Sequence, residues 1–224
     1  MSPRRSYDQH CSTARALDAV GDRWTLLIVR ELLAGPRRYT DLHADLPGVS
    51  TDVLASRLKD MERDGIATRR RLPPPAAASV YELTPRGRDL LPVLQALGGW
   101  GAAVPAERSP TDAVRAHWLA LPLLRLIEGN AGRGQQGLVE VRLDEGVFHL
   151  WVGAGEGAAY GDGAAPREPD LRLDLDMDTC ARLGGGDLTL DQAVLDGMVV
   201  MAGEGALADA LRGRPLPAAP TSAS

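Results

Sequence analysis

Residues 46–71 read LPGVSTDVLASRLKDMERDGIATRRR, and this stretch decides the fold of the first half of the chain. Its apolar residues recur at the spacing of a helix with one buried face: Val49, Val53, Leu54, Leu58 and Met61. Ser50 is placed to cap the first turn, and Gly65 suits the left-handed turn that ends a helix. We therefore expect one helix with a polar outer face.

The residues after Gly65 predict a basic hairpin. Ile66 to Arg71 has the pattern of a strand, residues 73–78 are a loose tip, and Val80 to Thr84 returns as a second strand. A short helix capped by Thr40, with a turn at residues 47–49, is expected to precede the polar helix. Two helices followed by a hairpin are typical of a winged helix-turn-helix.

Further helices are expected on both sides of this unit. Ser12–Gly21 and residues 25–35 form the first two, and the second is apolar over most of its circumference. Thr84 and Pro85 begin a helix that runs to Trp100. Its apolar stripe is longer than one small domain needs, so it is a candidate dimer surface.

Composition excludes several classes of protein. The 224 residues are 44% apolar and 25% charged, which is typical of a globular chain. No apolar run reaches the roughly 18 residues of a membrane span, and no signal peptide is recognised, so we expect a cytoplasmic protein with no membrane partner. Cys11 and Cys180 are too few for a disulfide framework or a zinc site.

The net charge of −5 is divided unevenly along the chain. Residues 1–104 hold 15 Arg and Lys against 12 Asp and Glu, a net of +3. Residues 105–224 hold 10 against 18, a net of −8. The basic half contains the helix and hairpin, so phosphate attraction is expected there and not in the acidic half.

Several motifs in the first half belong together. They are Cys11, GDRWTLLI at 21–28, RYTDL at 38–42, GVS at 48–50, RLK at 57–59, DG at 64–65, YELT at 81–84 and Trp100. In this order they resemble the HxlR family of bacterial winged-helix transcription regulators. The resemblance implies a homodimer that binds double-stranded DNA, most often as a repressor. We expect a regulator of this kind to need no cofactor.

The candidate DNA contacts follow from these elements. Arg57 on the polar helix face is expected to contact guanine or phosphate, the alternative being a solvated side chain paired with Asp60 or Asp64. For the hydroxyls near the helix start, capping and contact are both open. Alternation along the strand allows at most two of the hairpin arginines to face DNA together. The full set is Arg38, Ser50, Thr51, Ser56, Arg57, Lys59, Arg69, Arg70 and Arg71.

Cys11 has two interpretations. The family resemblance implies an oxidation sensor at this place, with a lowered thiol pKa to which His10 or Arg15 could contribute. The alternative is a small buried residue at a helix start.

The second half has a different pattern. A helix near Trp118 precedes strands at 138–143, 147–152 and 170–177, then two short helices, a buried strand at 197–203 and a last helix at 206–211. The pieces PDL at 169–171, LTL at 188–190 and GMVVMAGEGAL at 197–207 resemble the sterol carrier protein family. That resemblance implies a mixed sheet covered by helices around an apolar tunnel. The expected tunnel residues are Trp118, Phe148, Trp151, Met177, Met198 and Met201, although an ordinary core would need such residues too.

The expected architecture is therefore α+β. A winged helix-turn-helix domain spans residues 1–104, a sterol carrier protein-like domain 105–213, and a disordered tail 214–224. Scattered histidines, with no nucleophile elbow, phosphate loop or metal motif, argue against an enzyme and against a metal site.

Three hypotheses remain open. The first is a homodimeric repressor of a palindromic operator, modulated by a hydrophobic small molecule. The second is a redox-responsive regulator that senses through Cys11. The third is a lipid carrier or ligand-storage protein whose winged helix serves only for dimerisation.

Overall fold

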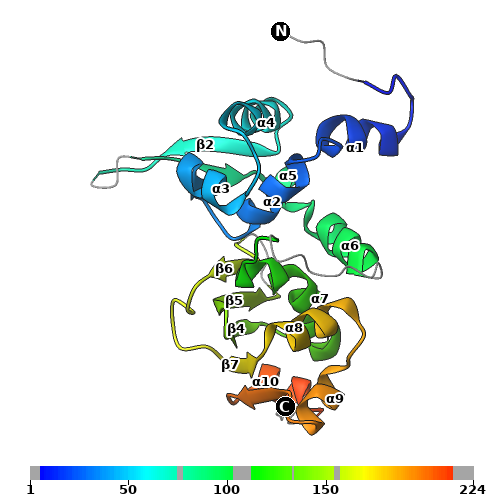
Figure 1. Cartoon of the computed structure of the whole chain (residues 1–224), viewed down its shortest axis with the longest axis vertical. Helices are drawn as coiled ribbons and strands as arrows, with labels where there is room; N and C mark the ends of the chain where they lie inside the picture. Colours follow the sequence, from blue (N-terminus) through cyan, green and yellow to red (C-terminus); the bar gives the residue numbers. More distant parts are fainter. Residues whose placement is uncertain (1–5, 75–77, 103–111, 133, 154–156, 214–224) are drawn as a thin grey trace, which may run out of the picture. The chain divides into compact units, whose positions relative to one another are not determined.

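The computed structural model describes residues 6–74, 78–102, 112–132, 134–153 and 157–213 (Figure 1). The chain separates into two compact units, Met1–Leu94 and Gln95–Ser224. The expected domain boundary at 104–105 and the expected tail at 214–224 lie outside the described residues.

The first unit is a winged helix-turn-helix. Its three-stranded antiparallel sheet has the order β1-β3-β2. In chain order the elements are α1 (Ser12–Val20), α2 (Thr25–Leu33), β1 (Arg37–Arg38), α3 (Tyr39–Asp45), α4 (Thr51–Arg63), β2 (Ala67–Arg71), β3 (Ser79–Leu83), α5 (Pro85–Arg88) and α6 (Leu91–Ala102), whose last two turns belong to the second unit.

Helix α4 forms as its sequence predicts. The Ser50 hydroxyl accepts a hydrogen bond from the Val53 amide at 3.3 Å, and Leu54, Leu58 and Met61 are fully buried. Gly65 follows with a φ of 68°, a conformation in which glycine has no Cβ penalty. Val53 was expected on the buried face but is 39% exposed, because it lies about 100° around the helix from Leu54.

Two local predictions need correction. The cap of α3 is Arg38 and not Thr40, and the Asp41 carboxylate accepts a hydrogen bond from the Arg38 amide at 3.3 Å. The strand expected at 170–177 ends at Leu175, because the Asp176 carboxylate accepts a hydrogen bond from the Thr179 amide at 2.7 Å and caps the next helix. That acidic residue therefore ends one element and begins another.

The β2–β3 hairpin is anchored at its base. The Thr84 hydroxyl donates to the Gly65 carbonyl at 2.6 Å and accepts from the Gly87 amide, which starts α5. A Cβ at Gly87 would collide with the Ile66 carbonyl, so only glycine permits this approach. In Figure 1 the hairpin projects past α3.

The second unit contains a five-stranded mixed sheet with the order β6-β5-β4-β7-β8. Strands β4 and β7 are parallel and the other pairs are antiparallel. In chain order the elements are the 3-10 helix η1 (Ala116–Leu119), α7 (Ala120–Ala131), β4 (Gly137–Leu143), β5 (Gly146–Val152), β6 (Tyr160–Asp162), β7 (Leu171–Leu175), α8 (Met177–Gly185), α9 (Leu190–Leu195), β8 (Val199–Ala202) and α10 (Ala206–Leu211).

The two faces of this sheet differ in chemistry. One face packs against helices and is fully buried at Val139, Val141, Phe148, Leu150, Leu171 and Leu173. On the other face Glu140 is buried between Arg142 and Arg172, at 2.8 and 3.2 Å, and also accepts the Ala165 amide. Burial of Glu140 would raise its pKa, but the hydrogen bonds from Ala165, Arg172 and Arg142 outweigh that effect and lower it. Among the described residues no helix is long and apolar enough to cross a membrane.

Candidate functional site

The outer face of α4 is a polar stripe. Asp52, Ser56, Lys59 and Arg63 are spaced by four, three and four residues and are all exposed, opposite the buried edge of the helix. Arg63 is held by Asp60 and Asp64, at 2.7 and 3.2 Å. Lys59 has no ion-pair partner within the described ranges. The lysine is therefore the cation on this face that is available to a partner.

Arg57 is held in place by neighbouring carboxylates. Its guanidinium pairs with Asp22, in the turn between α1 and α2, and with Asp60 at 2.7 Å. The Arg57 side chain is 23% exposed and that of Asp22 is 55% exposed. The pairing with Asp60 that the sequence left open is present. The contact with Asp22, 35 residues earlier, was not anticipated.

The start of α4 is fixed from α3. The Tyr39 hydroxyl donates to the Thr51 carbonyl at 2.8 Å, while the Ser50 side chain caps the helix. The hydroxyl of Ser50 is thus engaged in the cap. These contacts set the angle between the two helices of the motif, and Thr51 and Ser56 remain exposed beside them.

The hairpin arginines divide between two faces, as their alternation predicts. Arg69 and Arg71 share one face, where Arg69 donates to the Ser79 hydroxyl at 3.2 Å and lies over the Tyr81 ring. Arg70, on the other face, grips both Glu82 oxygens at 2.9–3.1 Å. Hydrogen bonding from Arg70 lowers the pKa of Glu82, so the two charges offset each other at neutral pH. Arg38 and Arg71 are exposed.

The two cysteines differ strongly. Cys11 is exposed and occupies the N-cap of α1, where hydrogen bonds from the backbone of Ala14 and then Thr13 lower the thiol pKa. The sequence suggested that His10 or Arg15 could contribute to the lowered pKa, and neither residue is among its causes. Burial raises the pKa of Cys180 to about 12, so that thiol is unreactive in the folded chain.

The six residues expected around a tunnel are not gathered at one cavity of the described structure. Phe148 faces the helices, whereas Trp151 lies on the opposite sheet face beneath Arg167. Trp118 lies in η1 against His117, and Met177 begins α8. Met198, before β8, is exposed, whereas Met201, within β8, is half-buried.

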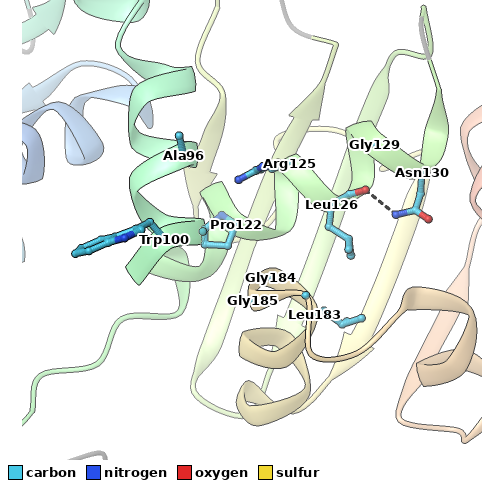
Figure 2. Close-up of a pocket in the computed structure, with 12 residues that line it drawn as sticks. Ala96, Trp100, Pro122, Arg125, Leu126, Gly129, Asn130, Leu183, Gly184 and Gly185 are labelled. Carbon is cyan, nitrogen blue, oxygen red and sulfur yellow. Dashed lines mark hydrogen bonds between the residues drawn. The ribbon is translucent and has the colours of Figure 1, made fainter. Parts of the chain in front are cut away.

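A groove of about 550 Å³ is found elsewhere in the second unit (Figure 2). We call it the α6–α8 groove. It is lined by Ala96, Gly99 and Trp100 of α6, by Pro122, Arg125, Leu126, Gly129 and Asn130 of α7, and by Leu183, Gly184, Gly185 and Gly186 at the end of α8. None of these residues was predicted from the sequence to contact a ligand. The run of three glycines was the available signal, because glycine permits a close approach: a Cβ at Gly184 would lie 2.6 Å from the Pro122 side chain.

Comparison with known proteins identifies the family to which the first unit is similar. The HxlR-like helix-turn-helix family matches residues 19–108. The HTH-type regulator YvaP of Bacillus subtilis is 37% identical over 86 residues, which are 38% of this chain and 80% of YvaP. The chain belongs to the HxlR-like family. Its members named here are transcriptional regulators, so this chain is a DNA-binding regulator and not an enzyme.

Other HxlR relatives cover the same part of the chain. The HTH-type transcriptional regulator YodB of Bacillus subtilis is 35% identical over 85 residues, 38% of this chain and 76% of YodB. A solved structure of YodB in its reduced form covers 45% of this chain and 100% of that one, at 30% identity and a TM-score of 0.40. The family match stops at residue 108, before the mixed sheet.

The Arg57–Asp22 pair gives a first prediction. We expect Arg57→Gln and Asp22→Asn to be coupled by about 0.2–1 kcal/mol, the range for partly exposed ion pairs. Hydrogen exchange of the α4 amides in the full chain measures this coupling through a double-mutant cycle. Arg71→Gln combined with Asp22→Asn is the matched control and should show none. Additive effects of Arg57→Gln and Asp22→Asn would mean that the pair does not fix α4.

Proposed function

We propose that this HxlR-family regulator is a homodimeric repressor of a palindromic operator, controlled by a small molecule bound in its second unit. The observation that supports DNA recognition best is the outer stripe of α4, with Ser56 and Lys59 free at its centre. In a dimer, the two α4 helices would enter successive major grooves of half-sites about one helical turn apart.

The proposed DNA contacts are made by the polar and basic side chains that no carboxylate in the described part of the chain neutralises. Lys59 and Ser56 reach base edges or phosphate in the major groove, and Thr51 lies near the free amides at the helix start. Arg38, Arg69 and Arg71 meet phosphates on either side, whereas Arg70 contributes little net charge because Glu82 offsets it. Ser50 and Arg57 act by positioning α4.

The dimer surface is proposed on α6. Val93, Leu97 and Trp100 recur at spacings of four and three and are 47%, 45% and 73% exposed. Such a stripe on one helix is costly to leave in water, and a second copy of the same helix would cover it in a two-fold interface.

The second unit is proposed to be a sterol carrier protein-like sensor. Its mixed sheet, with helices packed on one face, supports this proposal. A bound molecule alters DNA affinity only if it binds one arrangement of the dimer more tightly than the other. The family assignment favours this regulator over a carrier protein that does not bind DNA.

A second prediction tests the charges on DNA. The probe is a duplex of about 30 base pairs that the protein enriches from a random pool. We expect Lys59→Ala and Arg71→Ala each to reduce the slope of log affinity against log salt by about 1, because each loses a phosphate contact or its equivalent. The control, Arg70→Gln with Glu82→Gln, removes one charge of each sign and should leave the slope unchanged. Equal slopes for all variants would contradict the proposed interface.

A third prediction concerns the dimer. Leu97→Asp would place a charge in the proposed interface, so we expect a monomer by light scattering and at least about a tenfold loss of operator affinity. Leu195→Asp, at an 81% exposed position in α9, is the matched control and should remain dimeric. A dimeric Leu97→Asp variant would remove α6 from the interface.

A second candidate function is favoured by the Cys11 environment. The exposed thiol has a lowered pKa, so more of it is thiolate at neutral pH than for a free cysteine. The thiolate is the form that attacks hydrogen peroxide: an S–O bond forms, the O–O bond breaks, and the products are a sulfenic acid and hydroxide. Oxidation at the start of α1 would then change operator affinity.

A fourth prediction separates this candidate from the first. We expect peroxide to change the operator affinity of the wild type and of Cys180→Ala, but not of Cys11→Ser. As the pH falls, the rate of Cys11 alkylation should begin to decrease at a lower pH than for a thiol of ordinary pKa. Cys180 should be alkylated only after the protein unfolds. An equal peroxide response in Cys11→Ser would exclude sensing through this residue.

A further inference from the structure

The α6–α8 groove has the size and the walls of a small-molecule site. Its volume of about 550 Å³ falls within the range of about 300–1,000 Å³ typical of ligand pockets. Pro122, Leu126 and Leu183 supply apolar surface, and the backbone of Gly184 and Gly185 forms the wall at the end of α8. A flat apolar body of moderate size would be in contact on several sides.

One charged residue lies among the described residues that line this groove. Of the lining residues Arg125 alone is ionised, and Figure 2 shows its side chain projecting from α7 toward α6. One of its amino groups, Nη1, donates to the Gln95 carbonyl at 3.2 Å. A guanidinium has five N–H donors, so others remain for a ligand. At the α8 end, a Cβ on Gly185 would lie 3.5 Å from a carboxylate oxygen of Asp187, which does not itself line the groove.

Glycines keep the groove accessible. At Gly99 a Cβ would lie 2.7 Å from the Arg125 Nη1, so a larger residue would displace the guanidinium. At Gly129 a Cβ would meet nothing within 4 Å, so this wall faces open space. The arginine and the space beside it therefore depend on residues without side chains.

We propose that the α6–α8 groove binds a small amphipathic anion, with a flat apolar body against Pro122, Leu126 and Leu183 and a carboxylate paired with Arg125. The proposal rests on the proposed function and identifies the site and the class of effector. Carboxylates form two parallel hydrogen bonds with a guanidinium, which explains why a carboxylate is preferred to a neutral polar group.

The place of the groove suggests how binding would reach DNA. Helix α6 is continuous from Leu91 to Ala102, and the same helix carries the exposed stripe of Val93 and Leu97. A ligand seated between α6 and α7 favours one placement of α6, and through it one dimer arrangement.

The test uses the full chain and two probes that differ in charge. Affinities for 1-naphthoate and for neutral 1-naphthylmethanol are measured by ligand-observed NMR. We expect Arg125→Met to weaken naphthoate at least about tenfold and to leave naphthylmethanol unchanged, because only the charged contact is lost. Gly129→Leu should weaken both by filling the groove. Arg182→Met, an arginine of α8 outside the groove, is the matched control.

The outcomes distinguish the site from the function. Equal wild-type affinity for both probes, no binding of naphthoate, or no effect of Arg125→Met or of Gly129→Leu overturns the site. Operator affinity is then measured with saturating naphthoate. Binding that depends on Arg125 and shifts operator affinity supports both proposals. The same binding without a shift in operator affinity supports the site and overturns its role in regulation. DNA binding by the first unit is tested independently by the salt dependence of the Lys59 and Arg71 variants.

Discussion

The burial of one edge of α4 is the constraint on which the winged unit depends. Leu54, Leu58 and Met61 have to leave water, and once they do, the helical period places Ser56 and Lys59 on the outside. Burial alone leaves the helix free to rotate slightly about its axis. Contacts from Tyr39 to the Thr51 carbonyl and from Asp22 to Arg57 remove that freedom. The helix that carries the outer stripe is therefore held both from α3 and from the turn between α1 and α2.

In the second unit, burial of one face of the sheet determines where space for a ligand remains. Its sheet buries one face under helices, and Phe148 and Leu150 are fully buried in that core. Space occurs instead where glycines meet at the ends of helices, beside the charged head of Arg125. If the groove binds ligands as proposed, its apolar wall with one cation would select for amphipathic anions more strongly than a uniformly apolar tunnel. Because α6 contributes to this wall, sensing and dimerisation would share one helix.

Local patterns in the sequence predict much of this structure. The period and cap of α4, the hairpin with its alternating arginines and the mixed order of strands and helices are determined by neighbouring residues. Contacts between residues far apart in the chain could not be predicted from the sequence. Arg57 pairs with Asp22, which lies 35 residues earlier in the chain, and no local sequence pattern predicts that pair. Phe148 and Trp151 were assigned to one cavity, yet residues three apart on a strand face opposite sides. The glycine run at 184–186 predicts a turn, and only the packing of α6 and α7 beside it makes a groove.

We propose above that the outer face of α4 contacts DNA. A photo-crosslinking benzoylphenylalanine placed at Ser56 in the full chain tests it most directly, with the same group placed at Val194 of α9 as the control. We expect efficient crosslinks from position 56 to bases within each operator half-site, and none from position 194. Binding of the operator without crosslinks from position 56, or with equal crosslinks from both positions, would contradict it.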